Sequence, residues 1–340
     1  MPLAELVGQD LARERLLRLA QSGRVPSTLL FTGPPGVGKA LAARAFVQRL
    51  NCRRPVDDDA CGSCPTCIQI ARGRFPDLFR VLPDGIQIKI EQVSAIQEFI
   101  GFAPLTGAYR TVIIEEAHRL NGSAANALLK TLEEPPEQVL FILLTHRHNL
   151  LPETVLSRCL LLPFAFLKSS EVARILKQRP AAESAELDEA ALETAAAWSG
   201  GSLERALFFL DPDNLQWGRE FISAFAALPG SGPARALDLA QEAAGREDRE
   251  VVFYLLKLFL HQALLASRGS EDAEGGGFPA VWEDEIGRFA GLGPERLLQW
   301  HRRLLTVEEG QRVNLNLQLA FEAFFLTVAG RPGRNQAPGD

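Results

Sequence analysis

The sequence has few cysteines, no excess of basic residues and no long apolar run. Only five of the 340 residues are cysteine. The 36 Lys and Arg residues are outnumbered by 42 Asp and Glu, and the resulting net charge of −6 argues against strong unaided binding to nucleic acid. The longest apolar runs, such as residues 139–144, are too short to cross a bilayer, and residues 1–10 lack the basic and apolar regions of a secretion signal. We therefore expect a cytoplasmic protein that crosses no membrane.

The overall composition is that of an ordinary globular protein. Hydrophobic residues make up 46% of the chain and charged residues 23%, which excludes a disordered or fibrous protein. A length of 340 residues favours two or three domains. Basic residues are concentrated near the N-terminus, where they would form the patch that meets nucleic acid if any is bound. The nine Lys and Arg residues of segment 1–54, which holds three acids, are Arg13, Arg15, Arg18, Arg24, Lys39, Arg44, Arg49, Arg53 and Arg54.

Up to about residue 165 the chain alternates short apolar runs with helical stretches. The apolar runs at 28–31, 111–114 and 139–144 are bounded by turn signals or helices, as buried strands are. Strands that alternate with helices favour a parallel sheet with crossover helices. The predicted fold class is therefore α/β, with a Rossmann-like parallel sheet followed by all-helical segments.

From residue 168 onward Ala, Leu and Glu dominate, and the pattern predicts helices at 169–178, 187–198 and 202–210. A last helix near 312–328 is apolar enough to be either a subunit contact or a buried core helix. Residues 269–277 are expected to form a surface loop. The predicted domains are an α/β domain at 1–166 with a cysteine module at 52–67, a helical lid at 167–211, a helical domain at 212–330 and a disordered tail at 331–340.

A glycine-rich loop follows the first predicted strand and leads into an Ala-rich helix. It reads GPPGVGK and includes Gly33, Gly36, Gly38 and Lys39. Such glycines let backbone N–H groups converge on a phosphate at a helix N-terminus, where the lysine adds a positive charge. A simple Gly/Pro turn is the alternative. The next residue should carry a hydroxyl to bind Mg²⁺, but Ala40 has no oxygen to offer.

Two acids follow the second predicted strand, at the carboxyl edge of the sheet where α/β folds bind ligands. In nucleotide hydrolases the first acid of this Walker B motif is an Asp that helps to hold Mg²⁺, and the second is a Glu that polarises the attacking water. Here the first is Glu115, which is one methylene longer, and Glu116 keeps the second role formally available. Two solvated acids at a strand end are the alternative.

Four of the cysteines, Cys52, Cys61, Cys64 and Cys67, lie within sixteen residues of one another. In a reducing compartment this spacing favours tetrahedral Zn²⁺ over disulfides, and because all four positions are filled the zinc should be structural. His118 is therefore interpreted as an ordinary helix-start histidine, not as a further ligand. Arg158 follows the third strand, and from its chemistry alone it is a solvated loop arginine.

Taken together, these motifs identify a family. The chain resembles the delta-prime subunits of bacterial DNA polymerase III clamp loaders, which belong to the AAA+ superfamily, and the resemblance covers nearly the whole chain. The residues that carry it are Leu6-Val7-Gly8-Gln9, the loop 33–39, the four cysteines, Glu115-Glu116-Ala117-His118, the run ALLKTLEEPP at 127–136 with Ala125 and Asn126 before it, and Ser157-Arg158-Cys159.

The resemblance implies a role for Arg158 as an arginine finger, presented in trans to the nucleotide of a neighbouring subunit. It also implies a ring of loader subunits in which residues 212–330 form a collar with gamma/tau and delta subunits. The ring would open the sliding clamp, beta, and load it on primed DNA during replication. The subunit would then belong to a DNA-directed DNA polymerase holoenzyme and contact DNA only within the complex.

Three departures from the hydrolysing members favour delta-prime over the ATP-hydrolysing gamma/tau subunit. Ala40 removes the Mg²⁺ hydroxyl and Glu115 alters the neighbouring acid. Glu204 stands where hydrolysing members carry a phosphate-sensing Arg, and Arg205 points about 100° away from it on a helix. These departures, and the lack of a long basic C-terminal extension, predict no ATPase activity of its own and weak or absent binding of ATP or ADP. A working gamma/tau-type motor and a pure interaction scaffold are the alternatives.

Overall fold

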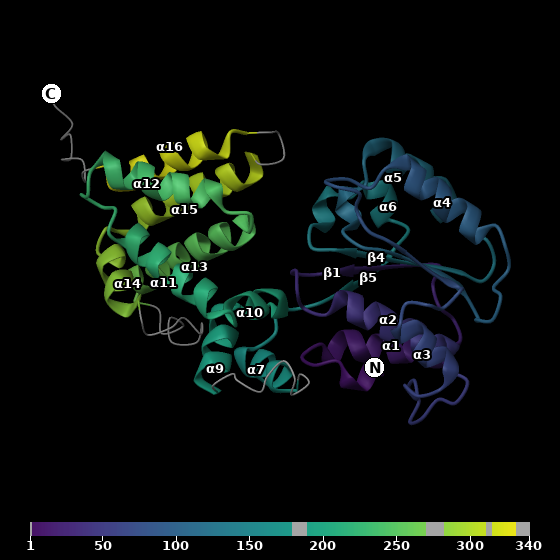
Figure 1. Cartoon of the computed structure of the whole chain (residues 1–340). Helices are drawn as coiled ribbons and strands as arrows, with labels where there is room; N and C mark the ends of the chain where they lie inside the picture. The colour runs from purple at the N-terminus through teal and green to yellow at the C-terminus, as the bar shows by residue number, and fades with distance from the viewer. Residues whose placement is uncertain (1, 179–188, 270–281, 311–314, 331–340) are drawn as a thin grey trace. The chain divides into compact units, whose positions relative to one another are not determined.

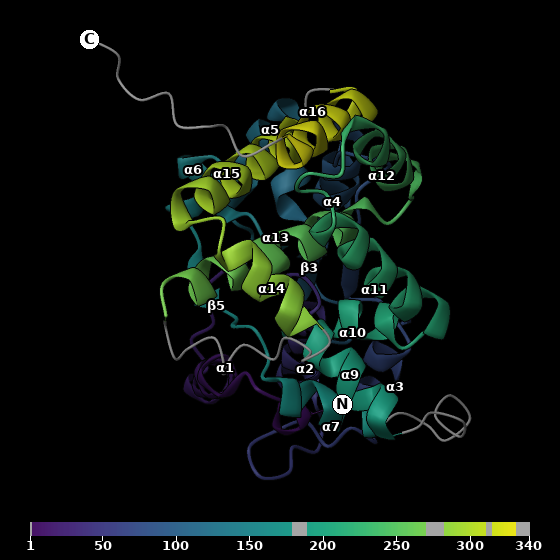
Figure 2. The same cartoon turned by 90° about the vertical axis from the view of Figure 1, so that its left-hand side faces the viewer.

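The computed structural model describes residues 2–178, 189–269, 282–310 and 315–330. These residues fall into two compact units. The first holds the residues up to 178 together with 201–204, and the second holds the residues of 189–200 and those from 205 onward. Figures 1 and 2 show the elements that make up each unit.

The first unit is built on a five-stranded parallel sheet with the strand order β2-β3-β4-β1-β5. Every residue of β1 and β4 is buried, as the continuous apolar runs predict for strands covered on both faces. The three strands predicted from these runs are confirmed to within a residue at each end. The strands are β1 (Thr28–Thr32), β2 (Leu78–Val81), β3 (Arg110–Ile114), β4 (Val139–Thr145) and β5 (Leu160–Pro163).

The sequence pattern missed β2 and β5, which are the two edge strands. Both are only four residues long, and each presents exposed side chains to solvent. Arg80 interrupts the apolar pattern of β2, and Pro163 ends β5. Short strands with charged or proline residues are common at sheet edges because they discourage pairing with another chain. Their local sequence therefore carries too little signal to be recognised without the neighbouring strand.

Helices cover both faces of the sheet (Figure 1). Leu29 and Phe31 of β1 pack in one core with α1, α2 and α3, and Leu30 packs in the other core with α4 and α5. This alternation along one strand fixes which helices lie on which face. The helices are α1 (Asp10–Ser22), α2 (Lys39–Asn51), α3 (Pro65–Ala71), α4 (Ile90–Ile100), α5 (Gly122–Glu133), α6 (Glu153–Leu156) and α7 (Ser169–Lys177), with short 3-10 turns η1 (Leu3–Glu5), η2 (Ala117–Arg119) and η3 (His148–Leu150).

Buried polar groups close the loops of the first unit. Gln9 receives a hydrogen bond from the Ala165 N–H and donates one to the Ala165 carbonyl, and so it ties the N-terminal segment to the chain beyond β5. Asp77 is fully buried and accepts N–H bonds from Leu105, Thr106 and Gly107. Burial opposes ionisation of Asp77, but these three N–H groups outweigh it and lower the pKa of the carboxyl.

The second unit is helical throughout the part that the structure describes. Its core includes Ala195, Trp198 and Phe209 together with the aromatic side chains of later helices, among which Phe225 contacts four other rings. The helices are α9 (Glu189–Trp198), α10 (Leu203–Phe209, whose first two residues belong to the first unit), α11 (Pro212–Ala226), α12 (Pro233–Gly245), α13 (Arg249–Ser267), α14 (Glu283–Ala290), α15 (Pro294–Gly310) and α16 (Leu317–Ala329).

One helix of this unit, α13, is long and apolar enough to cross a membrane, and half of its most apolar window is buried inside the unit. Its residues Phe253, Leu256 and Phe259 belong to the helical core. A core helix of a soluble protein meets the same criteria of length and hydropathy, so α13 is weak support for a membrane span. No other helix among the described residues meets them.

The helices predicted at 169–178, 187–198 and 202–210 correspond to α7, α9 and α10, although residues 179–188 lie outside the described part of the chain. The loop predicted at 269–277 and the tail predicted at 331–340 also lie outside it, apart from Gly269. The boundaries at 166 and 211 between an α/β domain, a lid and a collar stay predictions. The core of the second unit nevertheless includes side chains from both sides of residue 211.

Candidate functional site

The glycine-rich loop lies between β1 and α2, where the sequence predicts a phosphate-binding loop. Gly36 and Gly38 have φ angles of 71° and 95°, and α2 begins at Lys39. Positive φ at these positions lets the backbone turn sharply before the helix, which a residue with a Cβ resists. The N-terminus of α2 therefore opens toward the loop, as an anion-binding site requires.

Lys39 is folded back onto its own loop. Its Nζ donates to the carbonyl oxygen of Gly33 at 2.6 Å and to that of Pro34 at 2.5 Å. Burial lowers the pKa of Lys39 to about 8, against the opposing charges of Glu116 and Glu204. The ammonium thus satisfies its hydrogen bonds within the protein, and it would have to exchange these carbonyls for phosphate oxygens when a nucleotide binds.

Residues 202–204 cover the loop in the first unit. The Leu203 N–H donates to the Gly36 carbonyl at 2.8 Å. A Cβ at Gly36 would lie 2.3 Å from the Ser202 hydroxyl oxygen and 2.9 Å from the Glu204 backbone nitrogen, so this contact requires glycine. Glu204 is therefore the charged residue that this segment brings to the loop, and a carboxylate there repels phosphate.

The neighbouring arginine is engaged elsewhere. Within the second unit Arg205 donates to the Ser199 carbonyl at 2.7 Å, and its guanidinium carbon lies 3.9 Å from the centre of the Tyr254 ring. Burial raises the pKa of Tyr254 to about 12, with Arg205 opposing the shift. The cation–π contact and the hydrogen bond hold the Arg205 guanidinium against residues of the helical unit. That Arg205 is an imperfect substitute for a phosphate-sensing arginine stays a prediction.

Glu115, at the carboxyl end of β3, forms an ion pair with Arg80 of β2. Arg80 Nη2 lies 2.5 Å and Nε 3.1 Å from Glu115 Oε1. The Glu115 side chain is 20% exposed and that of Arg80 is 37% exposed. The acid that would support Mg²⁺ is thus paired with an edge-strand arginine, while Ala40 at the start of α2 offers no ligand oxygen.

Glu116 instead meets two histidines. Its Oε2 lies 3.5 Å from His118 Nε2, and its Oε1 lies 3.4 Å from His146 Nδ1. Burial opposes the charged form of Glu116, but His146, His118 and Arg119 outweigh it and lower the pKa of the carboxyl. Burial, with the charge of His146, lowers the pKa of His118 to about 4, so the imidazole is neutral at pH 7.

Arg158 lies in the turn between α6 and β5, and it is anchored, not freely solvated. Its Nη2 lies 2.6 Å from Glu133 Oε1 and its Nη1 donates to the Thr154 carbonyl at 2.7 Å. The Arg158 side chain is 33% exposed and that of Glu133 is 50% exposed. Glu133 ends α5, in the run that precedes Pro135-Pro136. The guanidinium is thus held at the surface in a defined orientation.

We expect Glu133→Gln to change the free energy of unfolding by less than about 1 kcal/mol, because ion pairs at this exposure are worth roughly 0.2–1 kcal/mol. Chemical denaturation followed by circular dichroism measures it. Glu134→Gln, at an exposed neighbour, is the matched control. A loss several times larger would mean that the Arg158–Glu133 pair is a structural element of the α5–α6 region.

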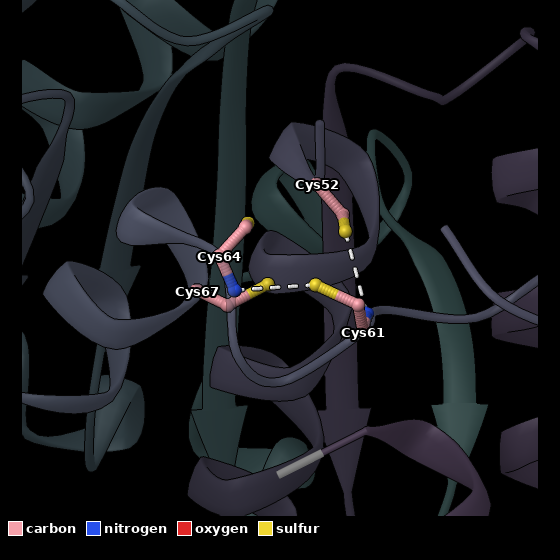
Figure 3. A group of neighbouring side chains, drawn as sticks. All are labelled: Cys52, Cys61, Cys64 and Cys67. Carbon is pink, nitrogen blue, oxygen red and sulfur yellow. Dashed lines mark hydrogen bonds between the residues drawn. The ribbon is translucent and has the colours of Figure 1, made fainter. Parts of the chain in front are cut away.

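The four cysteines come together at the end of α2 and the start of α3, and all four sulfur atoms lie within 4.8 Å of one another. Figure 3 shows Cys52 and Cys61 on one side of the group and Cys64 and Cys67 on the other. The Cys61 N–H donates to Cys52 Sγ and the Cys64 N–H to Cys61 Sγ, both at 3.3 Å.

These contacts fit a metal site. Backbone N–H groups of Ser63 and Cys64 lower the pKa of Cys61 to about 6, which favours the thiolate that binds a metal. Burial acts in the opposite direction at Cys67, where it raises the pKa and so opposes the thiolate. The Cys67 carbonyl accepts a hydrogen bond from Gln48. Four thiolates at this separation suit a tetrahedral ion such as Zn²⁺, as the spacing predicts.

Three residues of this region were not predicted from the sequence: Arg80, Thr145 and His146. Arg80 belongs to an edge strand that the pattern did not reveal. Thr145 is the last residue of β4 and His146 follows it, and the carboxyl end of a parallel strand is the one signal that could have singled them out. His146 lies beside Glu116 and Thr145 beside His118 because β3 and β4 are neighbours in the sheet.

Comparisons with known proteins agree with this architecture. The family model described as DNA polymerase III, delta subunit, matches residues 8–168. The chain is 31% identical over 254 residues to the DNA polymerase III subunit gamma of Buchnera aphidicola subsp. Acyrthosiphon pisum. The aligned region covers 74% of this chain and 70% of that protein. It is 30% identical over 247 residues to subunit tau of Bacillus subtilis, covering 73% of this chain.

A third relative is subunit delta' of Pseudomonas aeruginosa, 36% identical over 179 residues, which covers 51% of this chain and 52% of that protein. The chain spans 44% of the length of the Bacillus subtilis subunit tau. Similarity thus extends to gamma, tau and delta' subunits alike, and it does not distinguish among them. With its parallel five-stranded sheet, glycine-rich loop before α2 and helical C-terminal region, this chain belongs to the family of DNA polymerase III clamp-loader subunits of the AAA+ type.

Proposed function

We propose that this chain is a delta-prime-type subunit of the clamp loader that does not hydrolyse ATP itself. In this role it caps the loader ring and donates Arg158 in trans to the nucleotide of an adjacent subunit. One observation carries the proposal: both groups that would support Mg²⁺ are missing or engaged, since Ala40 has no oxygen and Glu115 is paired with Arg80. A gamma/tau-type motor needs both.

The glycine loop supports only a weak nucleotide site. Its backbone N–H groups need no hydroxyl to hold phosphate, and Lys39 remains mostly protonated at pH 7 with a pKa of about 8. Against this, residues 202–204 lie on Gly36, and Glu204 adds negative charge. Binding of ATP or ADP would have to displace this segment, so we propose that it is weak or absent.

The proposed partners are the gamma/tau and delta subunits, the sliding clamp, and primed DNA within the complex, in the cytoplasm. Helix α16 supports assembly of a ring. Phe321, Phe324 and Phe325 are buried in the core of the helical unit, whereas Leu319 is 61% exposed. Leu326, one heptad further along, is also exposed, so the helix both fills the core and presents an apolar stripe. We propose that this stripe contacts a neighbouring collar.

The purified chain should show no ATP turnover above that of the Lys39→Ala variant, because neither Ala40 nor the engaged Glu115 can position Mg²⁺. A coupled phosphate-release assay with and without primed DNA measures it, with a hydrolysing loader subunit as the positive control. Turnover that Lys39→Ala abolishes would restore the motor function and refute the delta-prime role.

A further inference from the structure

Glu116, His118 and His146 form a cluster of metal-ligating side chains that the clamp-loader role does not use. One ligand atom from each lies within 4.8 Å of the others. We propose that these three side chains bind a divalent transition-metal ion such as Zn²⁺, at a second site distinct from the four cysteines.

The positions of the donor atoms suit such an ion. Two bonds of about 2.0–2.1 Å that meet at a tetrahedral angle hold their donor atoms about 3.4 Å apart. In the structure Glu116 Oε1 lies 3.4 Å from His146 Nδ1, and Glu116 Oε2 lies 3.5 Å from His118 Nε2. These contacts are too long for ordinary hydrogen bonds. Each matches the donor spacing around a tetrahedral ion, and the two histidines face different oxygens of the carboxylate.

The other nitrogen of His118 already has a partner. His118 Nδ1 lies 3.0 Å from Thr145 Oγ1, which also accepts the Arg147 N–H. When Nδ1 carries the proton and donates it to Thr145, the lone pair of Nε2 faces Glu116. Metal-binding histidines are commonly oriented in this way by a hydrogen bond from the second ring nitrogen. Thr145 thus acts as a positioning residue for the proposed ligand.

The buried Nδ1 of His146 also points to a ligand. Among the described residues it makes no hydrogen bond of good geometry, and its contact with Glu116 Oε1 is long, at 3.4 Å. A buried polar atom without a partner is costly, and an unseen ion or water commonly explains it. The His146 ring meets that of His118 edge to face with centres 4.4 Å apart. The His118 side chain is only 6% exposed, so packing holds the rings in place.

The fold holds the three ligands on adjacent strand ends. Glu116 has a φ of 52° two residues beyond the end of β3, His118 lies in η2, and His146 follows β4. Because β3 and β4 pair in parallel, their carboxyl ends lie together. Two imidazoles and one carboxylate favour Zn²⁺, Co²⁺ or Ni²⁺ over Mg²⁺, which prefers oxygen ligands. Only three protein ligands are supplied, so a position stays open for water or substrate.

Neighbouring cations oppose binding, since Lys39 acts on Glu116 and both Arg119 and Arg147 act on His118. Arg119 Nε lies 3.5 Å from Glu116 Oε2, so it competes with an ion for the same carboxylate. We therefore expect Arg119→Ala to bind Zn²⁺ more tightly than the unmodified chain. A gain in affinity on removing an arginine is a result that general destabilisation would not produce.

The test is zinc stoichiometry of the full chain after loading with Zn²⁺ and gel filtration. We expect two equivalents for the unmodified chain, one at the cysteines and one at the new site, and a single equivalent for His118→Ala and for His146→Ala. His148→Ala, which changes an exposed histidine two residues from His146, is the matched control and should keep two. One equivalent in the unmodified chain, or two in both variants, would overturn the proposal.

A second measurement needs no variant and therefore does not depend on folding of a mutant. Imidazole nitrogen signals of the unmodified chain should shift for His118 and His146 on addition of Zn²⁺, while those of His148, His261 and His301 stay in place. Thr145→Val should lower the affinity for the second zinc ion by roughly 10–100-fold, which is the usual effect of losing a hydrogen-bond partner that orients a metal ligand. Shifts confined to the other histidines would contradict the assignment.

Discussion

Arg158→Ala should lower ATP turnover at the adjacent subunit of the assembled clamp loader by roughly 10³–10⁵-fold, the usual contribution of an arginine finger supplied in trans. In the proposed role, the guanidinium offsets charge that develops on the transferred phosphoryl group. Arg158 lies in the turn between α6 and β5, where Glu133 and Thr154 hold its guanidinium by hydrogen bonds. Its side chain is 33% exposed and therefore reaches the surface. The rate of clamp loading should fall together with ATP turnover. In bulk assays the fall in total turnover will be smaller, because the nucleotide sites of other subunits keep their own arginines.

The substitution should leave folding and assembly intact, because the ion pair with Glu133 is worth no more than about 1 kcal/mol at this exposure. Arg158→Lys tests the chemistry further, since an ammonium lacks the planar fork of the guanidinium. Arg24→Ala changes an exposed arginine that is distant from Arg158 in the sequence, and it controls for the loss of one positive charge. If the assembled Arg158→Ala complex loads clamps at the unmodified rate, Arg158 is a surface residue and the chain is an interaction scaffold.

Removing metal from the cysteine site should unfold residues 52–67 locally, because structural zinc contributes on the order of 10 kcal/mol to small modules. Hydrogen exchange of peptides from this segment, with and without a strong chelator, measures the effect. Exchange should rise there and stay unchanged in β1 and β4. Four thiolates bind Zn²⁺ more tightly than two imidazoles and a carboxylate. A weak chelator should therefore remove the ion from the proposed histidine site first.

Cys61→Ser should reproduce the effect of the chelator, since Cys61 receives two of the backbone N–H contacts that favour its thiolate. Cys159→Ser is the matched control. The Cys159 thiol donates to the Val155 carbonyl, and burial raises its pKa to about 11, so it lies outside the metal chemistry. Fresh protein that contains no zinc and carries disulfides among the four cysteines would contradict the structural-metal proposal.

Much of the fold was predictable because its signals are local. The strands at 28–31, 111–114 and 139–144 are continuous apolar runs, and the structure places them as central strands whose bounds differ by no more than one residue at each end. The edge strands β2 and β5 carry four residues each and depend on a neighbour for recognition. The glycine loop and the four-cysteine spacing were recognisable for the same local reason, since each motif lies within one short segment.

The sequence by itself determined the α/β class, the loop before α2, the cysteine group and the residues that depart from a hydrolysing site. Only the tertiary structure decided what those residues contact. The partners of Glu115, Glu116 and Gly36 come from β2, from the end of β4 and from residues 202–204. These pairs are distant in the chain, Arg80 and Glu115 being 35 residues apart. Local propensity cannot specify them, because strand order and packing alone bring such side chains to one edge of the sheet.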